Sequence, residues 1–306
     1  MADILDIYEI LDEDFRELID PAARLVKLWT GAEFGEGPAY FPAGRYLVWT
    51  DIPNDRMLRY DECSDRVAVF RHPCGFANGN TVDRQGRLVT CEHRNRRVSR
   101  TEHDGRITVI ADRYRGKLLN SPNDVVVHSD GAIWFTDPTY GIDDEKWGVH
   151  ASSEIGNQYV YRVDAASGQI EVAADDFIQP NGLAFSPDEK KLYIVDTGRT
   201  HVKEGPFHIR VFDVSDAGRL SAGRVFAECD PGAFDGLRVD EKGNIWTSAG
   251  ASVRCYRPDG GLIGRIKSPE SVANLVFGGP NLCRLYIAAT SSLYSIDLRA
   301  KGAKTF

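Results

Sequence analysis

One pattern recurs along the chain: a polar residue, a run of β-favouring residues, a tight turn and a second β-favouring run. The clearest copy covers residues 123–137, where the turn residue Gly131 lies eight positions after the opening Asn123. Two β-favouring runs joined by a short turn predict a β-hairpin. The pattern opens six times, with neighbouring openers 39 to 58 residues apart, at Glu36, Asn78, Asn123, Asn181, Asp235 and Asn274. A repeat of this length indicates a fold built from similar supersecondary units.

Further predicted strands lie between these hairpins, for example residues 57–60 with 66–70 and residues 159–163 with 169–172. Each unit then carries about four antiparallel strands, which at this period is typical of a β-propeller blade. Long helical patterns do not follow Arg24, whereas TIM barrels and Rossmann folds need a helix after nearly every strand. We predict an all-β fold, a six-bladed β-propeller of four-stranded blades, as a single domain over residues 1–306.

The two ends of the chain are expected to close the ring. Residues 24–29 form a β-favouring run that precedes the first opener and belongs to no hairpin. We expect this run to pair with the last blade, which contains residues 285–288 and 292–296, because a closed ring covers its strand edges. Residues 24–306 would then form the propeller, and residues 1–23 a helical or irregular extension packed outside it.

The openers are candidate ligands of a metal ion. In a propeller the first strand of each blade lines the central channel, so residues at the same position in each repeat face the same axis. For a single opener a simpler explanation exists, since Asn and Asp often begin strands by bonding to turn backbone. Together, however, the openers would bring the carboxylates of Glu36 and Asp235 beside four amides, and buried carboxylates need a compensating cation. Oxygen donors favour Ca²⁺ first and Mg²⁺ or Mn²⁺ second, with Zn²⁺ less favoured.

Composition limits the partners of the protein. Lys and Arg number 37 and Asp and Glu 45, and the formal net charge of −8 disfavours nucleic-acid binding. Residues 1–20 lack the features of a secretory signal, and no stretch of 18 apolar residues occurs. We therefore expect a soluble, cytoplasmic protein with a small-molecule partner and without a membrane or obligate protein partner. The six cysteines lack C-x-x-C spacing and are expected to be reduced and mostly buried.

Four motifs in order carry a family resemblance. They are Glu36-Gly37-Pro38, Ser121-Pro122-Asn123-Asp124, Gln179-Pro180-Asn181-Gly182 and Phe234-Asp235-Gly236-Leu237-Arg238-Val239-Asp240. Over about residues 30–295 the chain resembles the gluconolactonase, regucalcin and luciferin-regenerating-enzyme family. Residues 91–98 and 137–141 are most similar to its bacterial gluconolactonase branch.

The resemblance implies one Ca²⁺ in the central channel, held by Glu36, Asn181 and Asp235. Asn123 matches a position that either completes the metal shell or binds substrate. Regucalcin-like members carry an arginine for the substrate hydroxyls two residues before this asparagine. Here Ser121 occupies that position, so their mode of sugar binding does not transfer.

Other candidate residues have both structural and functional interpretations. His93 ends the inner hairpin of the second blade, near the opposite mouth of the channel if the strands run straight, so a buried structural histidine competes with a functional one. Tyr140 and Trp147 lie in a long insertion that would form a lid or rim, where specificity is expected. We take Asn78, Tyr140 and His93, together with Asn123, as candidate substrate-binding residues.

Two features favour a structural interpretation. Ser121 lacks the G-x-S-x-G elbow of a nucleophilic serine, and its neighbour Pro122 fits a turn. The arginines at positions 94, 96, 97 and 100 are interpreted as a solvated face rather than a nucleic-acid patch.

Three functions are compatible with these observations. The first is a Ca²⁺-dependent lactonase that hydrolyses a sugar lactone such as glucono-1,5-lactone, in which the ion polarises the carbonyl and Asp235 activates water as the base. Because a nearby cation lowers the pKa of a carboxylate, electrophilic activation could carry most of this catalysis. The second is an organophosphate hydrolase on the same scaffold. The third is a non-enzymatic calcium-binding or interaction propeller.

Overall fold

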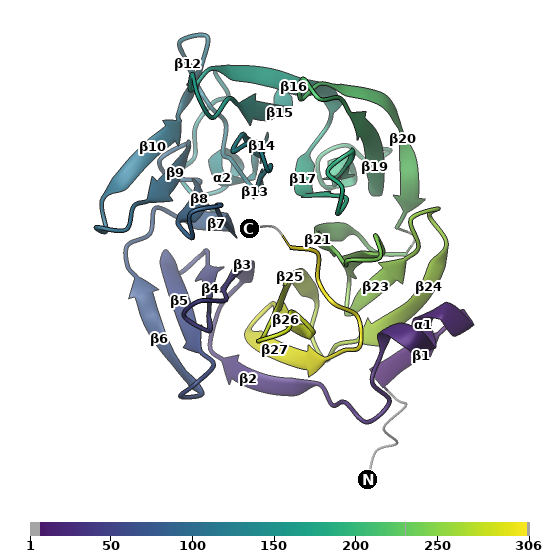
Figure 1. Cartoon of the computed structure of the whole chain (residues 1–306). Coiled ribbons are helices and arrows are strands. Elements are labelled where there is room, and N and C mark those ends of the chain that lie inside the picture. Colours follow the sequence, from purple (N-terminus) through teal and green to yellow (C-terminus); the bar gives the residue numbers. More distant parts are fainter. Residues whose placement is uncertain (1–6, 230, 305–306) are drawn as a thin grey trace.

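The computed structural model describes residues 7–229 and 231–304. Its strands form antiparallel sheets that surround one axis as six blades, which Figure 1 shows in a view along that axis. In each blade the chain runs from an inner strand at the channel to strands at the surface. The prediction of a six-bladed β-propeller is confirmed.

The strands of each blade follow in order from the channel outward. Blade 1 contains β3 (Gly35–Phe41), β4 (Tyr46–Asp51), β5 (Arg56–Asp61) and β6 (Arg66–Arg71), and blade 2 contains β7 (Ala77–Val82), β8 (Leu88–Glu92), β9 (Arg97–Thr101) and β10 (Ile107–Ala111). Blade 3 contains β13 (Val125–Val127), β14 (Ile133–Asp137), β15 (Gln158–Val163) and β16 (Ile170–Phe177), and blade 4 contains β17 (Pro180–Phe185), β18 (Lys191–Asp196), β19 (His208–Val214) and β20 (Leu220–Glu228).

The last two blades include strands from near the N-terminus. Blade 5 contains β21 (Phe234–Val239), β22 (Ile245–Ala249), β23 (Ser252–Tyr256) and β24 (Leu262–Lys267), with β1 (Tyr8–Ile10) added outside. Blade 6 contains β25 (Val272–Gly278), β26 (Arg284–Ala289), β27 (Ser292–Asp297) and β2 (Val26–Thr30). The remaining elements are α1 (Glu13–Leu18), β11 (Arg113–Tyr114), β12 (Lys117–Leu118), α2 (Tyr140–Asp143) and the 3₁₀ helix η2 (Gly198–Thr200). No helix within the described ranges is long and apolar enough to cross a membrane.

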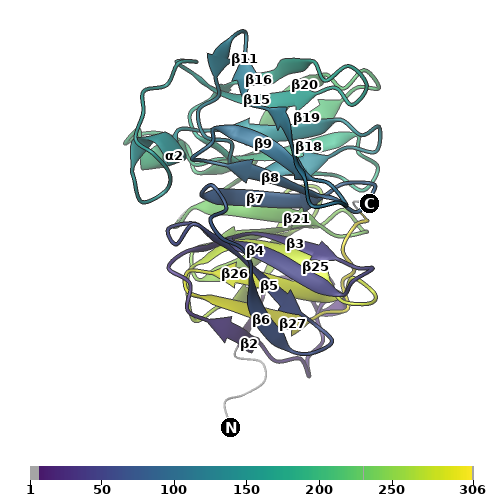
Figure 2. The same cartoon turned by 90° about the vertical axis from the view of Figure 1, so that its left-hand side faces the viewer.

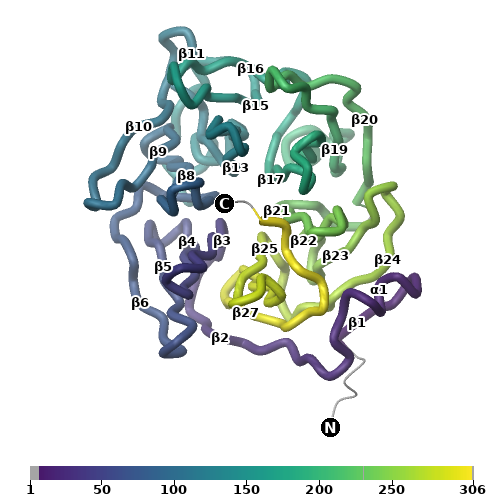
Figure 3. The backbone as a smooth tube through the Cα atoms, in the orientation of Figure 1, coloured from purple at the N-terminus to yellow at the C-terminus, as the bar shows by residue number. Residues whose placement is uncertain are grey.

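The ring is closed by strands from the two ends of the chain. β2 pairs antiparallel with β27, so that Val26 lies opposite Ser295. In Figure 3 the purple β2 runs along the outside of the yellow blade 6. The carboxylate of Glu270 accepts hydrogen bonds from the hydroxyls of Ser292 (2.6 Å) and Tyr294 (2.7 Å) in β27. The predicted closure by the N-terminal run is confirmed.

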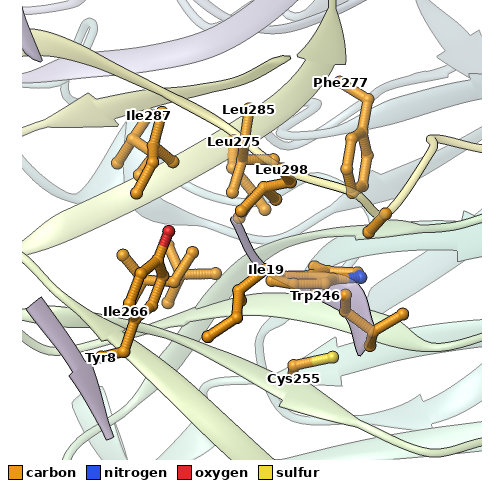
Figure 4. Packing of buried hydrophobic residues seen from close by; sticks show 14 of the residues in the cluster. Tyr8, Ile19, Trp246, Cys255, Ile266, Leu275, Phe277, Leu285, Ile287 and Leu298 are labelled. Carbon is orange, nitrogen blue, oxygen red and sulfur yellow. The ribbon is translucent and has the colours of Figure 1, made fainter. Parts of the chain in front are cut away.

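The N-terminal extension contains a strand that the sequence did not predict. The helical part of the expectation is met by α1, but β1 pairs with β24 as a fifth strand of blade 5, with Tyr8 opposite Ile266. Tyr8 and Ile19 pack into the apolar cluster around Trp246, which Figure 4 shows from close by. This packing covers the outer edge of blade 5. The part of the expectation that concerns residues 1–6 lies outside the described residues.

Glycines let the inner strands approach one another closely around the channel. A Cβ atom added to Gly37 would lie 2.0 Å from the carbonyl oxygen of Asn78, and one added to Gly79 would lie 2.4 Å from that of Asn123. At Gly182 the same construction comes within 2.3 Å of the carbonyl oxygen of Asp235. Such distances are far inside van der Waals contact, so only glycine fits. With Gly236, whose added Cβ atom would lie 2.1 Å from the side chain of Asn274, four openers thus precede a glycine that packs on the neighbouring blade.

The C-terminal segment lies against the other end of the channel. The amide of Ala303 donates to the carbonyl of Val239 (3.0 Å), and Gly302 forms a β-bridge with Asp240. In Figure 2 this segment and α2 lie at opposite ends of the ring. The end that carries α2 is therefore the open one.

Candidate active site

A cavity of about 380 Å³ occupies the α2 end of the channel. Five of the six predicted openers line it: Glu36, Asn78, Asn123, Asn181 and Asp235. His93, Tyr140 and Trp147 line the same cavity. Apart from Asn274, every residue that we assigned from sequence as a candidate catalytic, substrate-binding or metal-binding group thus lines one cavity.

The local backbone explains why the openers converge. In five inner strands the pairing register shifts beside the opener, as between Glu36 and Ala39 in β3 and between Phe234 and Leu237 in β21. A bulge of this kind re-aims a side chain and bends the strand. The side chains near it turn toward the axis at the mouth of the channel.

Asn274 is an exception, and its predicted place in the ring is wrong. The cavity is lined by Ala273 instead. The side chain of Asn274 accepts the amide of Leu275 (2.8 Å), as that of Asp124 accepts the amide of Val125 (2.9 Å). Asn274 therefore corresponds to the residue after an opener, one position out of phase.

Glu36 is buried, with 5% of its surface exposed, and is held by neutral donors. It accepts hydrogen bonds from the side-chain amide of Asn274 (3.0 Å) and from the backbone amide of Gly37. Burial, together with the nearby charge of Asp124, raises the pKa of Glu36 to about 7. Without a cation this carboxylate is costly to ionise.

Asp235 lines the same cavity as Glu36. Burial and the charge of Glu36 raise the pKa of Asp235 well above its ordinary value, while a hydrogen bond from Asn181 acts in the opposite direction. The side-chain nitrogen of Asn181 also lies 3.4 Å from the hydroxyl of Thr197. Because this nitrogen donates to both Asp235 and Thr197, the side-chain carbonyl oxygen of Asn181 remains available as an acceptor.

The donor set fits a hard divalent cation. Within residues 7–229 and 231–304 no three His, Cys, Asp or Glu side chains gather as a metal-binding group. A cation here would instead have two carboxylates, Glu36 and Asp235, and the amide oxygens of Asn123 and Asn181. An all-oxygen set with two negative charges suits Ca²⁺ and offers nothing that prefers Zn²⁺. The raised pKa values of Glu36 and Asp235 come first from burial and then from neighbouring carboxylates, and a divalent cation would compensate both charges.

His93 lies at the cavity and not near the opposite mouth of the channel, as we had expected. Because β8 runs antiparallel to β7, Glu92 pairs with Ala77 and the end of the hairpin returns to its starting side. The histidine Nε2 accepts from the side-chain amide of Asn78 (3.2 Å), and Nδ1 donates to the carbonyl of Trp147 (2.8 Å). Burial lowers the pKa of His93 to about 4, so the ring is neutral and positions both partners.

The predicted insertion forms part of the rim. It begins with α2, which carries Tyr140, and it brings Trp147 edge-on to Phe34, with ring centroids 5.0 Å apart. The structural interpretation of Ser121 also agrees with its contacts. The serine hydroxyl donates to the carbonyl of Pro138 (2.8 Å) and accepts the amide of Gly141 (2.9 Å), which anchors the start of the insertion.

The arginines are only partly solvated, which corrects the predicted solvated face. The side chain of Arg94 is 44% exposed, but that of Arg96 is 12% exposed and donates to the carbonyl of Leu119 (2.6 Å). Arg94 pairs with Asp55 (3.1 Å), and Arg97 pairs with Glu92 (2.8 Å). Four of the six cysteines are buried, as expected. None of these groups lines the cavity.

Sequence reasoning missed a second set of cavity residues, at the ends of the inner hairpins. Ile52, Thr197 and Gly250 each follow the second strand of their blade, as the predicted residue His93 does. An antiparallel hairpin returns to the mouth from which it started, so the position after the second strand was a usable signal. Thr200, in η2, also lines the cavity, and no repeat marks it.

Comparisons with known proteins agree with this architecture. A family model described as "SMP-30/Gluconolactonase/LRE-like region" matches residues 34–291. A gluconolactonase of Zymomonas mobilis is 27% identical, over 93% of this chain and 84% of the relative, and a pentonolactonase of Haloferax volcanii is 27% identical, over 90% and 95%. The solved structure of a gluconolactonase from Xanthomonas campestris is 38% identical, with a TM-score of 0.89 and coverage of 96% and 95%. The chain belongs to the SMP-30/gluconolactonase/LRE-like family.

Proposed function

We propose that this protein hydrolyses a sugar lactone, such as glucono-1,5-lactone, to the aldonic acid with the help of a bound divalent cation, Ca²⁺ in preference to Mg²⁺ or Mn²⁺. Its family relatives include two enzymes named as lactonases, and an enzyme that hydrolyses cyclic esters is the class to which this chain belongs. The observation that carries the finer proposal is the pair of carboxylates, Glu36 and Asp235, that share one cavity with amide oxygens.

Glu36, Asp235, Asn181 and Asn123 would hold the cation. When bound there, a divalent cation supplies electrophilic polarisation of the lactone carbonyl. Glu36 remains the fixed ligand, because Asn274 and Gly37 already bind its carboxylate. Asn78 and Tyr140 face the remaining volume of the cavity and would contact the substrate.

The reaction requires movement of one proton from water to the ring oxygen. Water attacks the carbonyl carbon, the ester C–O bond breaks, and the ring oxygen becomes a hydroxyl of the open-chain acid. We assign Asp235 as the base that receives the proton from water, because it faces the cavity whereas Glu36 is tied to neutral donors. Asp235 then gives this proton to the ring oxygen as the ester C–O bond breaks. Because a nearby cation lowers the basicity of a carboxylate, polarisation of the carbonyl by a bound cation would supply most of the rate enhancement.

The proposal is tested by a pH-stat assay on a panel of lactones beside a panel of organophosphates. We expect hydrolysis of lactones, loss of it in a chelator, and recovery with Ca²⁺ that exceeds recovery with Zn²⁺. Asp235→Ala should abolish lactone hydrolysis, whereas Asp216→Asn, at an exposed carboxylate far from the cavity-lining set, should not. An active, folded Asp235→Ala variant would show that the site is wrong, and better recovery with Zn²⁺ would show that the ligand set is wrong.

A further inference from the structure

Three hydroxyl groups meet on one wall of the cavity. The hydroxyl of Tyr140 lies 2.7 Å from that of Thr197 and 2.8 Å from that of Thr200. All three side chains line the cavity. They come from two blades, since Tyr140 belongs to α2 in blade 3 and the threonines follow β18 in blade 4. We call these residues the hydroxyl triad.

The triad is connected to the candidate cation ligands on its inner side. Thr197 donates to the backbone carbonyl of Gln179 (3.1 Å) and lies 3.4 Å from the side-chain nitrogen of Asn181. Thr197 is buried, with 3% of its surface exposed. The position of Thr197 in the cavity is therefore fixed by the backbone at Gln179, directly before the inner strand β17.

An ionisable pair holds the triad from outside. Nδ1 of His201 lies 2.8 Å from the hydroxyl of Thr200, and Nε2 lies 2.8 Å from the carboxylate of Asp143. The carboxylate also accepts the hydroxyl of Thr139 (2.6 Å), and the His201 ring packs edge-on to Tyr140 at 5.2 Å. The pair thus joins α2 to η2 across the gap between two blades.

Other parts of the cavity wall are apolar. Phe34 and Trp147 form a T-shaped aromatic pair at the cavity, and Phe234 and Val272 also line it. The cavity therefore offers aromatic and aliphatic surface in addition to a group of hydroxyls. A polyhydroxylated ring has the same two kinds of surface, C–H groups and hydroxyls.

We propose that the hydroxyl triad Tyr140–Thr197–Thr200 is the subsite that selects polyhydroxylated lactones, and that His201 and Asp143 are positioning residues that hold it in place. This inference rests on the proposed lactonase function and names the part of the substrate that the chain recognises. The hydroxyls of the substrate face the triad, and the C–H groups of the substrate face Trp147 and Phe34.

The chemistry of the triad suits this role. Thr197 donates its hydroxyl proton to the carbonyl of Gln179 (3.1 Å), and Thr200 donates to the carbonyl of Thr197 (2.8 Å). Both threonine oxygens can therefore accept hydrogen bonds from the hydroxyls of a substrate. Burial raises the pKa of Tyr140 to about 12, so its phenol keeps its proton and remains a donor over the working pH range. Tyr140, Thr197 and Thr200 line the cavity, so this side of it would bind hydroxyls through neutral groups.

The first test compares two substrates that differ only in their hydroxyl-bearing substituents, glucono-1,5-lactone and δ-valerolactone. In Tyr140→Phe the ratio of their kcat/KM values should fall by about 3- to 10-fold, the effect of one neutral hydrogen bond, mainly through a higher KM for the sugar lactone. Thr200→Val should act in the same direction, and Thr200→Ser, which keeps the hydroxyl, should restore the ratio. An unchanged ratio, or an equal loss for both substrates, would overturn the proposal.

The second test addresses the positioning residues. His201→Ala should raise KM for glucono-1,5-lactone several-fold with little change in kcat, and His201→Gln, which can still bridge Thr200 and Asp143, should recover most of the loss. His103→Ala, at an exposed histidine in the turn between β9 and β10, is the matched control. A loss of kcat without a change in KM would contradict a positioning role.

A binding measurement separates this inference from the proposed function. Gluconate and 5-hydroxyvalerate are titrated into wild type and Tyr140→Phe by isothermal calorimetry. We expect wild type to prefer gluconate and the variant to lose that preference. If wild type hydrolyses no lactone, the proposed function fails, and the gluconate preference alone then decides whether the subsite exists. If lactones are hydrolysed but the preference survives in Tyr140→Phe, only the subsite is refuted.

Discussion

The buried carboxylate of Glu36 should destabilise the protein when no cation is bound. Asn274 and Gly37 donate to it, but neither carries a positive charge. Replacement by glutamine keeps an oxygen that can accept both bonds and removes the ionisable group. Glu36→Gln should therefore stabilise the metal-free protein at alkaline pH, although it removes a candidate cation ligand.

The size of this effect follows from the pKa of Glu36, which burial and Asp124 raise from 4.5 to about 7. Between these values the folded protein holds a proton that the unfolded chain releases, so the free energy of unfolding falls as the pH rises through this interval. One pKa unit corresponds to about 1.4 kcal/mol, which makes the total loss roughly 3 kcal/mol above pH 7. The stabilising contribution is fully present below pH 4.5.

The assay is urea unfolding of wild type and Glu36→Gln in a chelator at pH 5 and pH 8. We expect the free energy of unfolding of the variant to exceed that of wild type by up to about 3 kcal/mol at pH 8 and by much less at pH 5. With Ca²⁺ at 100 times its Kd the free energy of unfolding of the wild type should rise by about 2.7 kcal/mol. Most of this rise should be absent in Glu36→Gln, which lacks a candidate cation ligand. Glu145→Gln, at an exposed position, controls for the loss of a charge. A metal-free variant that is less stable than wild type at pH 8 would refute the reasoning.

Two further predictions concern packing and the serine. Gly236→Ala would place a Cβ atom 2.1 Å from the side chain of Asn274, and we expect a loss of about 1–3 kcal/mol from overpacking, measured by thermal unfolding; an unchanged melting temperature would show that the inner strands can separate there. Ser121→Ala removes the bonds to Pro138 and Gly141, so it should lower stability by about 1 kcal/mol and keep most lactone hydrolysis. Complete loss of activity in a folded Ser121→Ala protein would instead support a nucleophilic serine.

Much of the site was predictable because a propeller repeats its geometry. Residues at the same position in successive repeats face one axis. For this reason Glu36 and Asp235, which are 199 positions apart in the sequence, line one cavity. The phase failed at Asn274, where Val272-Ala273-Asn274-Leu275 aligns with Phe234-Asp235-Gly236-Leu237. An asparagine one position later resembled an opener, although the backbone turns Ala273 toward the cavity.

Sequence alone determined the number of blades, the closure of the ring and the identity of most groups at its mouth, because these depend on local periodicity. Only the tertiary structure decided which groups contact one another between blades. The return of β8 to the α2 end of the channel brought His93 to the cavity, and the approach of α2 to η2 brought Tyr140 to Thr197 and Thr200. Contacts of this kind depend on loop conformation and on the angle between neighbouring blades, and neither leaves a periodic signal in the chain.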